Sequence, residues 1–483
     1  LSNRVFIPDR QKVSGNAKDP RYVLTNAPLP VLFYGVFMAV TDKHPQYMAA
    51  QKSWQMMRDA IAGEEEIKQA AVRYLPKSAG MIEAEKQGDT AGEIYRAYVN
   101  RAQYPLWIQD SLRTMIGLVS KLEPDIVIES NLLTGLINNA TNDGFGLKQL
   151  FIRISLELLE YGRCGLLVDV DANGVPYFAL YDALSIINWK ENSIGGRKDL
   201  KLLVLEEQFD NSNDEFGHET KTVHRVLSMQ DGALTVRLFD GAIPEDKTPD
   251  LGGNQLSFTP FVFCGTTDNS PDVGSVPLLT MAKAALKYYQ LSADYFQSLH
   301  HTSHPQPWIS GLDEDSDISV TGVMAVWSLP HESTCGYLEI SGDGIDMTKK
   351  EMDAQKNSAL EAGAKVIDTN TQESGEARRA RQDDQHASLH SIVMCAAEAI
   401  EQAIKYAAQW LKLDPSKYAF TVEPEFIVQQ YDINLAKQLY EGALAGKNSF
   451  KTYWEYIATG KLPTHEYEEE LDRVEDERNS LPL

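Results

Sequence analysis

The feature that most constrains the fold lies between Val276 and Ala364, where a helix, a short strand-rich insert and a second helix follow one another. In the first helical pattern apolar residues recur at three or four positions over about twenty-five residues, which predicts a rod of roughly 37 Å. A helical hairpin with a small β tip cannot bury its apolar surface alone. The chain is therefore expected to pack against copies of itself.

The length and the cysteines narrow the class of protein. A chain of 483 residues exceeds the usual limit for one hydrophobic core, so two or more structural regions are expected. No run of about eighteen apolar residues occurs, so the sequence predicts no membrane anchor. The four cysteines, at 164, 264, 335 and 395, show no close pairing and are interpreted as buried, reduced thiols.

The net charge restricts the kind of nucleic-acid contact. The formal charge is −24, whereas a protein that grips DNA through many phosphates needs a basic surface that displaces counterions. Two alternatives remain. Either the chain does not touch nucleic acid, or its contact is weak because the polymer must move past it.

The pattern along the chain predicts an α+β fold of mostly antiparallel type. Four prolines within residues 1–43 indicate an extended arm, and apolar spacing of three or four residues then predicts helices up to Glu160. Pro105 is expected to kink or divide one of them. Alternating patterns between turn residues predict strands at 165–169, 177–180, 200–206, 222–229, 234–239 and 258–264.

The second half of the chain is predicted to be mainly helical. Ser275 is a candidate helix cap, with Pro277 in the first turn. Short strands are expected at 308–310, 323–327 and 336–340, and the helical pattern resumes at Asp346. A polar loop, 368–375, precedes the longest helix, which ends before Asp414-Pro415.

Two motifs partly match sites of known chemistry. His300, His301 and His304 could suggest a metal, but a zinc protease needs a glutamate directly after the first histidine. Residues 442–449 are one residue short of a phosphate-binding loop, and Asn448 replaces the hydroxyl that would hold magnesium. Neither pattern predicts a metal or a cofactor.

The acidic groups do not indicate catalysis either. Residues 313–317 lack the end of a calcium loop, and carboxylate pairs such as Asp383-Asp384 are too common in an acidic chain to identify a hydrolase. No Gly-x-Ser-x-Gly nucleophile elbow occurs. The sequence therefore predicts a protein that is not an enzyme.

Basic residues gather near the end of the hairpin and at the start of the longest helix. They admit two interpretations, ordinary pairing with acidic neighbours on the same helix or transient contact with the phosphates of a passing polymer. The second interpretation includes the polar loop between them. The candidate contact residues are Lys349, Lys350, Lys356, Lys365, Thr369, Asn370, Thr371, Gln372, Arg378, Arg379 and Arg381.

Short motifs follow one another in a fixed order from His44 to about Trp410. None has the composition of a catalytic site, so each is interpreted as a packing signature. They are His44-Pro45 with Trp54 and Arg58, Arg73–Pro76, Gly117–Val119 with Lys121, Tyr161–Asp169, Ile187–Trp189, Ser292–Tyr295 and Gly336–Glu339.

In these motifs, and in the order of its parts, the chain resembles the portal proteins of tailed bacteriophages, the head-to-tail connectors. The resemblance implies an α+β portal fold with a wing, a helical stem, a small β-containing clip and a helical crown. By this likeness residues 1–43 are the N-terminal arm, 44–274 the wing, 275–302 the first stem helix, 303–345 the clip, 346–366 the second stem helix, 367–376 the tunnel loop, 377–428 the long wing helix and return strand, and 429–483 the crown.

The resemblance also implies a function and partners. It implies a structural ring of about twelve subunits at one vertex of the virion, assembled in the host bacterial cytoplasm, through which double-stranded DNA is packaged and ejected. The clip would meet the large subunit of the terminase first and head-tail adaptor proteins later. Capsid and scaffold proteins are further implied partners.

The geometry of helices supports a ring independently. Twelve helices, each about 10 Å thick and side by side in a circle, enclose a lumen of roughly 28 Å, which passes a duplex of roughly 20 Å. An acidic lining suits such a channel because strong attraction would hold DNA that must slide. Two alternatives stay open: a metal-dependent enzyme acting on DNA or glycan, and another ring protein of the head-tail junction, such as an adaptor.

Overall fold

The computed structural model describes most of the chain after residue 39. The predicted arm therefore lies almost entirely outside the described residues, as do the predicted strand at 323–327 and the acidic patch at 313–317. The described residues are 40–89, 92–171, 174–194, 197–210, 216–240, 244–248, 256–303, 306–311, 332–338, 342–363, 375–424, 433–459, 462, 465 and 467–480.

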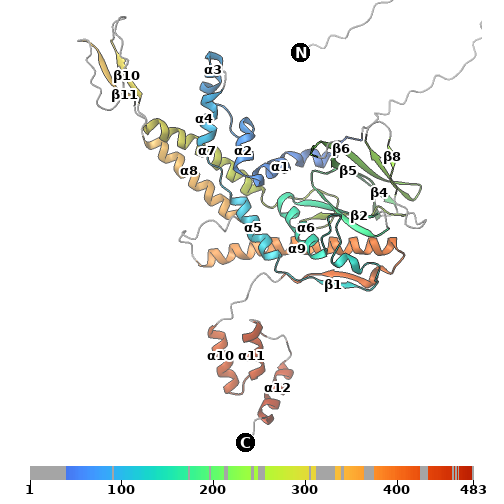
Figure 1. The fold of residues 1–483 in the computed structure, drawn as a ribbon. Coiled ribbons are helices and arrows are strands. Elements are labelled where there is room, and N and C mark those ends of the chain that lie inside the picture. The colour runs from blue at the N-terminus through green and yellow to red at the C-terminus, as the bar shows by residue number, and fades with distance from the viewer. Residues whose placement is uncertain are drawn as a thin grey trace, which may run out of the picture. The chain divides into compact units, whose positions relative to one another are not determined.

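Helices form the first layer of the main body (Figure 1). His44 caps the first of them, since its Nδ1 atom accepts the Gln46 amide at 3.3 Å, and Gly63 ends it. Pro105 lies between two helices, which confirms the predicted division. The helices are α1 (Pro45–Ala62), α2 (Glu64–Gln69), α3 (Ala79–Gln87), α4 (Glu93–Arg101), α5 (Trp107–Val119) and α6 (Leu147–Tyr161).

Two antiparallel sheets follow, and the turn and strand patterns predict their strands except β4 and β8. One has the strand order β3-β2-β9, and the other runs in sequence from β4 to β8. Every strand pair is antiparallel, so the mixed α+β class is confirmed. The strands are β2 (Arg163–Val170), β3 (Pro176–Asp182), β4 (Ile186–Ile194), β5 (Arg197–Asp210), β6 (Thr220–Gln230), β7 (Ala233–Phe239), β8 (Glu245–Asp246) and β9 (Phe261–Gly265).

The longest helix, α9 (Gly375–Trp410), packs against α6, β2 and β9 and joins the helical layer to the smaller sheet. Its predicted apolar stripe is buried, including Val393, Ile400 and Ala407. After α9 the chain forms β12 (Tyr418–Thr421), which pairs with β1 (Asp125–Ile128). The sequence patterns did not indicate β1, because four residues that alternate only between exposed and half-buried carry a weak strand signal.

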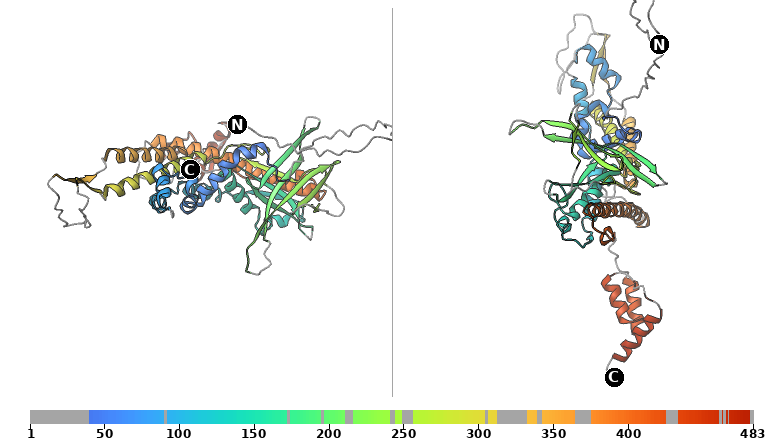
Figure 2. Two further views of the ribbon diagram at one scale, coloured as in Figure 1. Left: turned by 90° about the horizontal axis from the view of Figure 1, so that it is seen from above. Right: turned by 90° about the vertical axis from the view of Figure 1, so that its right-hand side faces the viewer.

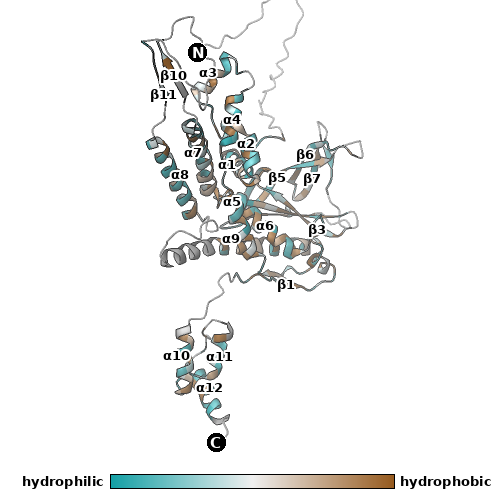
Figure 3. Cartoon of the chain, turned by 60° about the vertical axis from the view of Figure 1, so that its left-hand side comes forward, coloured by the Kyte–Doolittle hydropathy of each residue, from teal (hydrophilic) through white to brown (hydrophobic). Residues whose placement is uncertain are grey.

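The predicted hairpin consists of α7 (Leu279–Ser303) and α8 (Gly342–Glu361), which pack side by side (Figure 2). Beyond them lies a two-stranded antiparallel hairpin of β10 (Gln306–Ser310) and β11 (Thr334–Leu338). Figure 3 shows hydrophilic residues along much of α8. A further set of helices, α10 (Ile433–Leu444), α11 (Phe450–Thr459) and α12 (Tyr467–Ser480), follows β12 in the chain.

The start of α7 differs from the prediction. The helix begins at Leu279, so Ser275 is not its cap. Gly162, the residue that ends α6, has a φ of +73°, and a Cβ atom added there would lie 2.4 Å from the Ser275 carbonyl oxygen. The backbone at Ser275 is thus held against the end of α6, and the helix starts after this contact.

We expect Gly162→Ala to lower the free energy of unfolding by about 2–5 kcal/mol, from left-handed backbone strain and the clash with Ser275. Gly232→Ala is the matched control, because Gly232 has a φ of +83° and no described atom lies within 4 Å of an added Cβ. It should cost only about 1–2 kcal/mol. Urea denaturation measures both, and equal losses would contradict the close approach at Gly162.

Two further observations concern the cysteines and the helices. Cys164, Cys264 and Cys395 are buried and free, as expected, but Cys335 is exposed. The expectation is wrong for Cys335 because it lies in a two-stranded hairpin on which no other described helix or strand packs extensively. Among the described helices, none has the length and apolar character that crossing a bilayer requires.

Candidate functional site

The second half of α7 is fastened to α4 and to the turn after it by hydrogen bonds. The Tyr98 hydroxyl donates to the Asp294 carboxylate at 2.5 Å, and Arg101 Nη1 donates to the Gln297 amide oxygen at 2.8 Å. The Ser292 hydroxyl accepts a backbone amide from the turn after α4 at 2.9 Å. Two of the motif residues, Ser292 and Asp294, therefore hold the hairpin in a fixed direction.

The second helix of the hairpin is largely uncovered. Its buried side chains are Met352, Ala359 and Leu360, which lie on one face because they are seven and eight residues apart. The large apolar side chain of Met347 is 65% exposed. Since α8 packs against α7 along one face, most of its circumference is available for contact with other molecules.

The β tip of the hairpin exposes aromatic side chains. Trp308 and Tyr337 are 45% and 60% exposed. Trp308 lies opposite Gly336, where an added Cβ would be 3.1 Å from the indole nitrogen, so the glycine lets the ring lie across the strand pair. The motif Gly336–Glu339 is in this respect a packing signature, as interpreted from the sequence.

Three of the predicted channel residues are described with their side chains on α8. Lys349 is 3.5 Å from Asp353 in an intrahelical ion pair, and both side chains are about half exposed. Lys350 is exposed, and Lys356 is half-buried. The three lysines share α8 with five acidic residues, so this helix is acidic overall. For Lys349 the pairing matches the interpretation of ordinary exposed charge.

For the other candidate contact residues, the structure describes either the backbone alone or nothing. Arg378, Arg379 and Arg381 belong to the first turns of α9, and the structure describes their backbone alone. The loop residues lie outside the described part of the chain, together with the last lysine of the set. Their contact with DNA stays a prediction for Lys365, Thr369, Asn370, Thr371 and Gln372.

Motif residues far apart in the sequence meet in one buried cluster. Trp54 is fully buried and donates from its indole nitrogen to the Tyr161 carbonyl at 2.9 Å. The His44 ring stacks on Trp189 with 3.9 Å between ring centres. The Arg163 guanidinium lies 3.9 Å from the centre of the Trp189 ring. These residues join α1, β2 and β4, and none of their contacts forms a catalytic arrangement.

Arg163 is a feature of this cluster that sequence reasoning missed. It is 1% exposed, and its three side-chain nitrogens have no hydrogen-bond partner in the described part of the chain. Burial lowers the pKa of the Arg163 guanidinium to about 10, so it stays charged at neutral pH. Burial and this neighbouring charge also lower the pKa of His44, which keeps its ring neutral as the cap of α1.

A second buried centre is Asp59, which no sequence pattern singled out. Its side chain is 2% exposed and accepts hydrogen bonds from Arg73 at 2.8 Å, the Tyr74 hydroxyl at 2.7 Å and Gln55 at 2.7 Å. It therefore ties α1 to the Arg73–Pro76 motif. A buried carboxylate whose oxygens accept hydrogen bonds in this way stabilises packing and is not available to react with a substrate.

An acidic cavity of about 710 Å³ lies between α6, β3, β5 and β6. Arg225 neutralises part of it by donating to Glu207 at 2.6 Å and to Asp169 at 3.2 Å. Glu157 also lines it, and one of its oxygens is buried without a hydrogen bond among the described residues. Burial, assisted by the Glu160 charge, raises the pKa of Glu157 from its ordinary 4.5 to about 8.

This raised pKa predicts a pH dependence of stability. The folded chain holds the Glu157 proton between pH 4.5 and about 8, whereas the unfolded chain releases it. The contribution to stability is therefore full below pH 4.5 and is lost as the pH rises towards 8. We expect Glu157→Gln to unfold at a higher urea concentration than the unaltered protein at pH 8 and at a similar one at pH 4.5. A constant difference between the two proteins would contradict this protonation.

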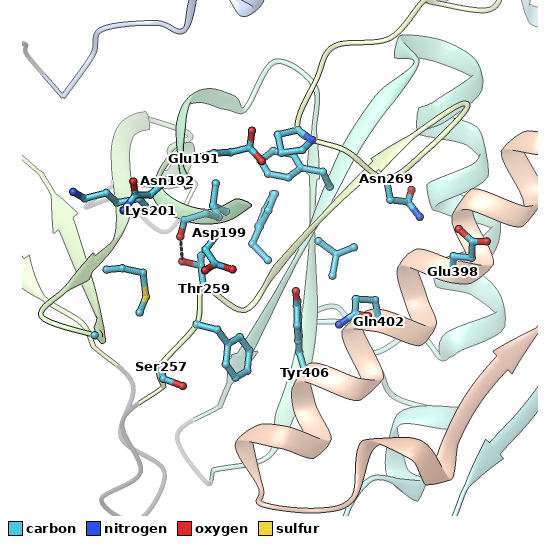
Figure 4. A pocket seen from close by; sticks show the side chains of 18 residues that line it. Glu191, Asn192, Asp199, Lys201, Ser257, Thr259, Asn269, Glu398, Gln402 and Tyr406 are labelled. Carbon is cyan, nitrogen blue, oxygen red and sulfur yellow. Dashed lines mark hydrogen bonds between the residues drawn. The ribbon is translucent and has the colours of Figure 1, made fainter. Parts of the chain in front are cut away.

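Another cavity, of about 740 Å³, is lined by residues of β4, β5, β9 and α9 (Figure 4). Glu398, Gln402 and Tyr406 lie along one side of α9 and face strand residues across the cavity. Thr259 donates its hydroxyl proton to the Leu200 carbonyl at 3.0 Å, so it is not free to act as a nucleophile. In the described part of the chain, no group of three or more histidine, cysteine or acidic residues is placed to hold a metal ion.

The segment that partly matches a phosphate-binding loop has another role in the structure. The Ser449 amide donates to Glu470 at 2.7 Å, and the Phe450 and Lys451 amides donate to Glu477 at 2.7 and 2.9 Å. Carboxylates of α12 therefore occupy the amides at the start of α11 that a phosphate would need.

Of the candidate metal histidines, His301 lies 2.7 Å from the Gln297 amide nitrogen and is exposed. His300 belongs to the last turns of α7, and His304 lies outside the described residues. His300 and His301, the candidate metal histidines that the structure describes, thus form contacts that are common at the end of a helix.

Comparisons with known proteins give distant matches. A family described as a domain of unknown function (DUF4055) matches residues 277–411, which run from the residues before α7 to the end of α9. No curated protein matches the sequence. The hairpin and the longest helix are thus the part of the chain that a known family covers.

Solved structures similar to this chain come from gene transfer agent particles. A chain of the native virion is 13% identical with a TM-score of 0.39, covering 74% of this chain and 91% of that one. A chain of the empty particle's neck is 13% identical with a TM-score of 0.39, covering 80% and 95%. A chain of the native neck is 13% identical with a TM-score of 0.38, covering 74% and 91%. A likeness this distant indicates no function by itself.

Proposed function

We propose that the chain is the subunit of a portal, a structural ring at one vertex of a phage-like capsid through which double-stranded DNA passes. About twelve copies surround the channel. In this proposal α7 and α8 form the stem, β10 and β11 belong to the clip, and the α+β body is the wing. Residues 429–483 form the crown. The ring lies in the virion and is assembled in the bacterial cytoplasm.

The observation that carries the proposal is the α7–α8 hairpin. Hydrogen bonds of Tyr98, Arg101 and Ser292 hold the second half of α7 against the body, whereas α8 buries three side chains and leaves most of its surface exposed. A hairpin in which one helix is held by the body and the other is largely exposed is suited to side-by-side packing in a circle. The net charge of −24 favours a channel in which DNA slides over one that binds it.

The proposed partners follow from the same arrangement. The exposed aromatic side chains Trp308 and Tyr337 give the tip a surface of the type that is common in protein interfaces. In the proposal this tip binds the large subunit of the terminase during packaging and head-tail adaptor proteins afterwards. The wing meets capsid and scaffold proteins. The loop 367–376 and the arginines at the start of α9 face the channel.

Two other functions compete with this one. A metal-dependent enzyme acting on DNA or glycan would cleave its substrate when magnesium is added to purified protein. In the acidic cavity the pairing of Glu207 and Asp169 with Arg225 argues against their acting as metal ligands. Another ring protein of the head-tail junction, such as an adaptor, would usually be a much shorter chain without two long stem helices.

The mass of the assembly in solution tests the proposal. The subunit mass is 53.9 kDa, so a ring of about twelve copies should have a mass near twelve times that value in native mass spectrometry. Magnesium should not induce cleavage of added DNA or glycan. A monomer under all ionic conditions, or magnesium-dependent cleavage, would overturn the proposal.

A further inference from the structure

Among the described residues of α10–α12, more large apolar side chains are exposed than buried. Leu444, Trp454 and Tyr467 are 63%, 67% and 74% exposed. The buried apolar side chains of these helices include only Tyr456 among large residues of the described part. A unit of this size rarely forms a sufficient core by itself, so its exposed apolar side chains are expected to be covered by another surface.

The exposed side chains form one stripe across α10 and α11. Phe450, Trp454 and Ile457 are spaced at four and three residues, which puts them on one face of α11. The Tyr440 ring on α10 contacts Phe450 with 6.2 Å between ring centres, and Leu444 follows one turn later. We call these five residues the α10–α11 stripe.

Helix α12 has two different faces. Its inner face holds α11, because Glu470 and Glu477 accept the amides at the start of that helix and Arg473 donates to Glu455 at 3.2 Å. Its outer face carries Tyr467 and Leu471, four residues apart and both exposed. Two exposed acidic residues of α12, Glu468 and Glu475, flank that pair on the helix surface.

The stripe and the outer face of α12 are complementary. Lys447 and Lys451 are exposed beside the stripe, and neither forms an ion pair within the described residues. They match the carboxylates around Tyr467 and Leu471. Within one chain the two surfaces do not cover each other, because Trp454, Tyr467 and Leu471 are all exposed.

We propose that the α10–α11 stripe of one copy packs against the outer face of α12 of the neighbouring copy. The proposal rests on the ring proposed above and adds a specific contact to it. The two surfaces differ, so the contact is head-to-tail, and its repetition around an axis closes a ring. Tyr467 and Leu471 of the neighbour cover Trp454, while Lys447 and Lys451 pair with the neighbour's carboxylates.

Charge reversal in the full-length assembled protein tests this contact. One variant carries Lys447→Glu and Lys451→Glu, a second carries Glu468→Lys and Glu475→Lys, and a third carries all four changes. Hydrogen exchange of residues 450–459 and 467–480 is measured in the ring and in dissociated subunits. Assembly of the unaltered protein should slow this exchange about tenfold, each double variant should lose the protection, and the fourfold variant should regain it.

The apolar part of the contact is tested separately. Trp454→Glu should abolish the protection of residues 467–480 in the neighbour, whereas Met48→Glu, a change of an exposed apolar residue on α1, should leave it intact. Protection that is already present in dissociated subunits would show that the chain covers its own stripe and would overturn the proposal. So would protection that survives both double variants.

These outcomes separate the contact from the ring itself. Native mass spectrometry of each variant reports whether about twelve copies still assemble through the stem. Rings that persist while the protection never appears would refute the crown contact and leave the portal proposal standing. Absence of rings in the unaltered protein would refute the portal proposal and, with it, the contact.

Discussion

Replacing Trp54 with alanine is expected to lower the free energy of unfolding by about 3–5 kcal/mol. The side chain is fully buried, lies edge-on to Tyr47 with 5.5 Å between ring centres, and donates to the Tyr161 carbonyl. Its removal leaves a cavity between α1 and α6 and an unsatisfied buried carbonyl. Both effects act where the helical layer meets the start of β2, so the loss should appear in urea denaturation of the whole body.

Two further variants test the cause of that loss. Trp54→Phe keeps much of the ring but not the N–H donor, so it should cost less than the alanine variant, and its own cost should include about 1–3 kcal/mol for the orphaned carbonyl. Met48→Ala changes a residue of the same helix that is 57% exposed and should stay within about 0.5 kcal/mol of the unaltered protein. A loss below about 1 kcal/mol for Trp54→Ala would contradict the buried position of this side chain.

Replacing Met352 with aspartate is expected to prevent ring formation. Met352 is 1% exposed on the packed face of α8, and a charge placed there without a partner costs several kcal/mol. The hairpin should open, because α8 has few other buried side chains with which to hold its position against α7. We expect the fraction of protein in rings to fall at least tenfold in native mass spectrometry.

The control for this variant is Met48→Asp, which makes the same chemical change at an exposed position on α1. It should assemble as the unaltered protein does. Circular dichroism and urea denaturation of Met352→Asp check that the α+β body stays folded. Normal rings in a folded Met352→Asp protein would contradict the role of the hairpin in assembly.

Much of the fold could be predicted from local patterns. The three- and four-residue spacing that begins at Tyr47 and ends before Gly63 belongs to α1, and Pro105 separates α4 from α5. The turn at Asp231-Gly232 joins β6 and β7, which pair directly. These features depend on residues that are close in the sequence, where spacing and turn chemistry determine the backbone.

The features that sequence reasoning missed depend on distant residues. Strand β1 exists because Asp125–Ile128 pairs with Tyr418–Thr421. Most residues of the main body lie between these two segments in the sequence. The start of α7 depends on the close approach of Ser275 to Gly162. Asp59 is polar on a helix and becomes buried only because Arg73 and Tyr74 bind it. No local pattern reports such contacts.

The candidate site was predictable in outline rather than in detail. The hairpin could be inferred because two long amphipathic patterns flank a short strand-rich insert. The lysines of α8 could not be assigned to DNA from their positions, since Lys349 pairs with Asp353 on the same helix. The capping of Ser449 by Glu470 was also beyond sequence reasoning, because it joins two helices through a carboxylate in an acidic run.

The central claim is that copies of this chain close into a ring around a channel wide enough for DNA. Images of the purified full-length protein, averaged down the symmetry axis, test it most directly. The proposal predicts closed rings of about twelve subunits with a central lumen of roughly 28 Å lined by stem helices. Images that contain only monomers or open chains, or rings too narrow for a duplex of roughly 20 Å, would contradict it.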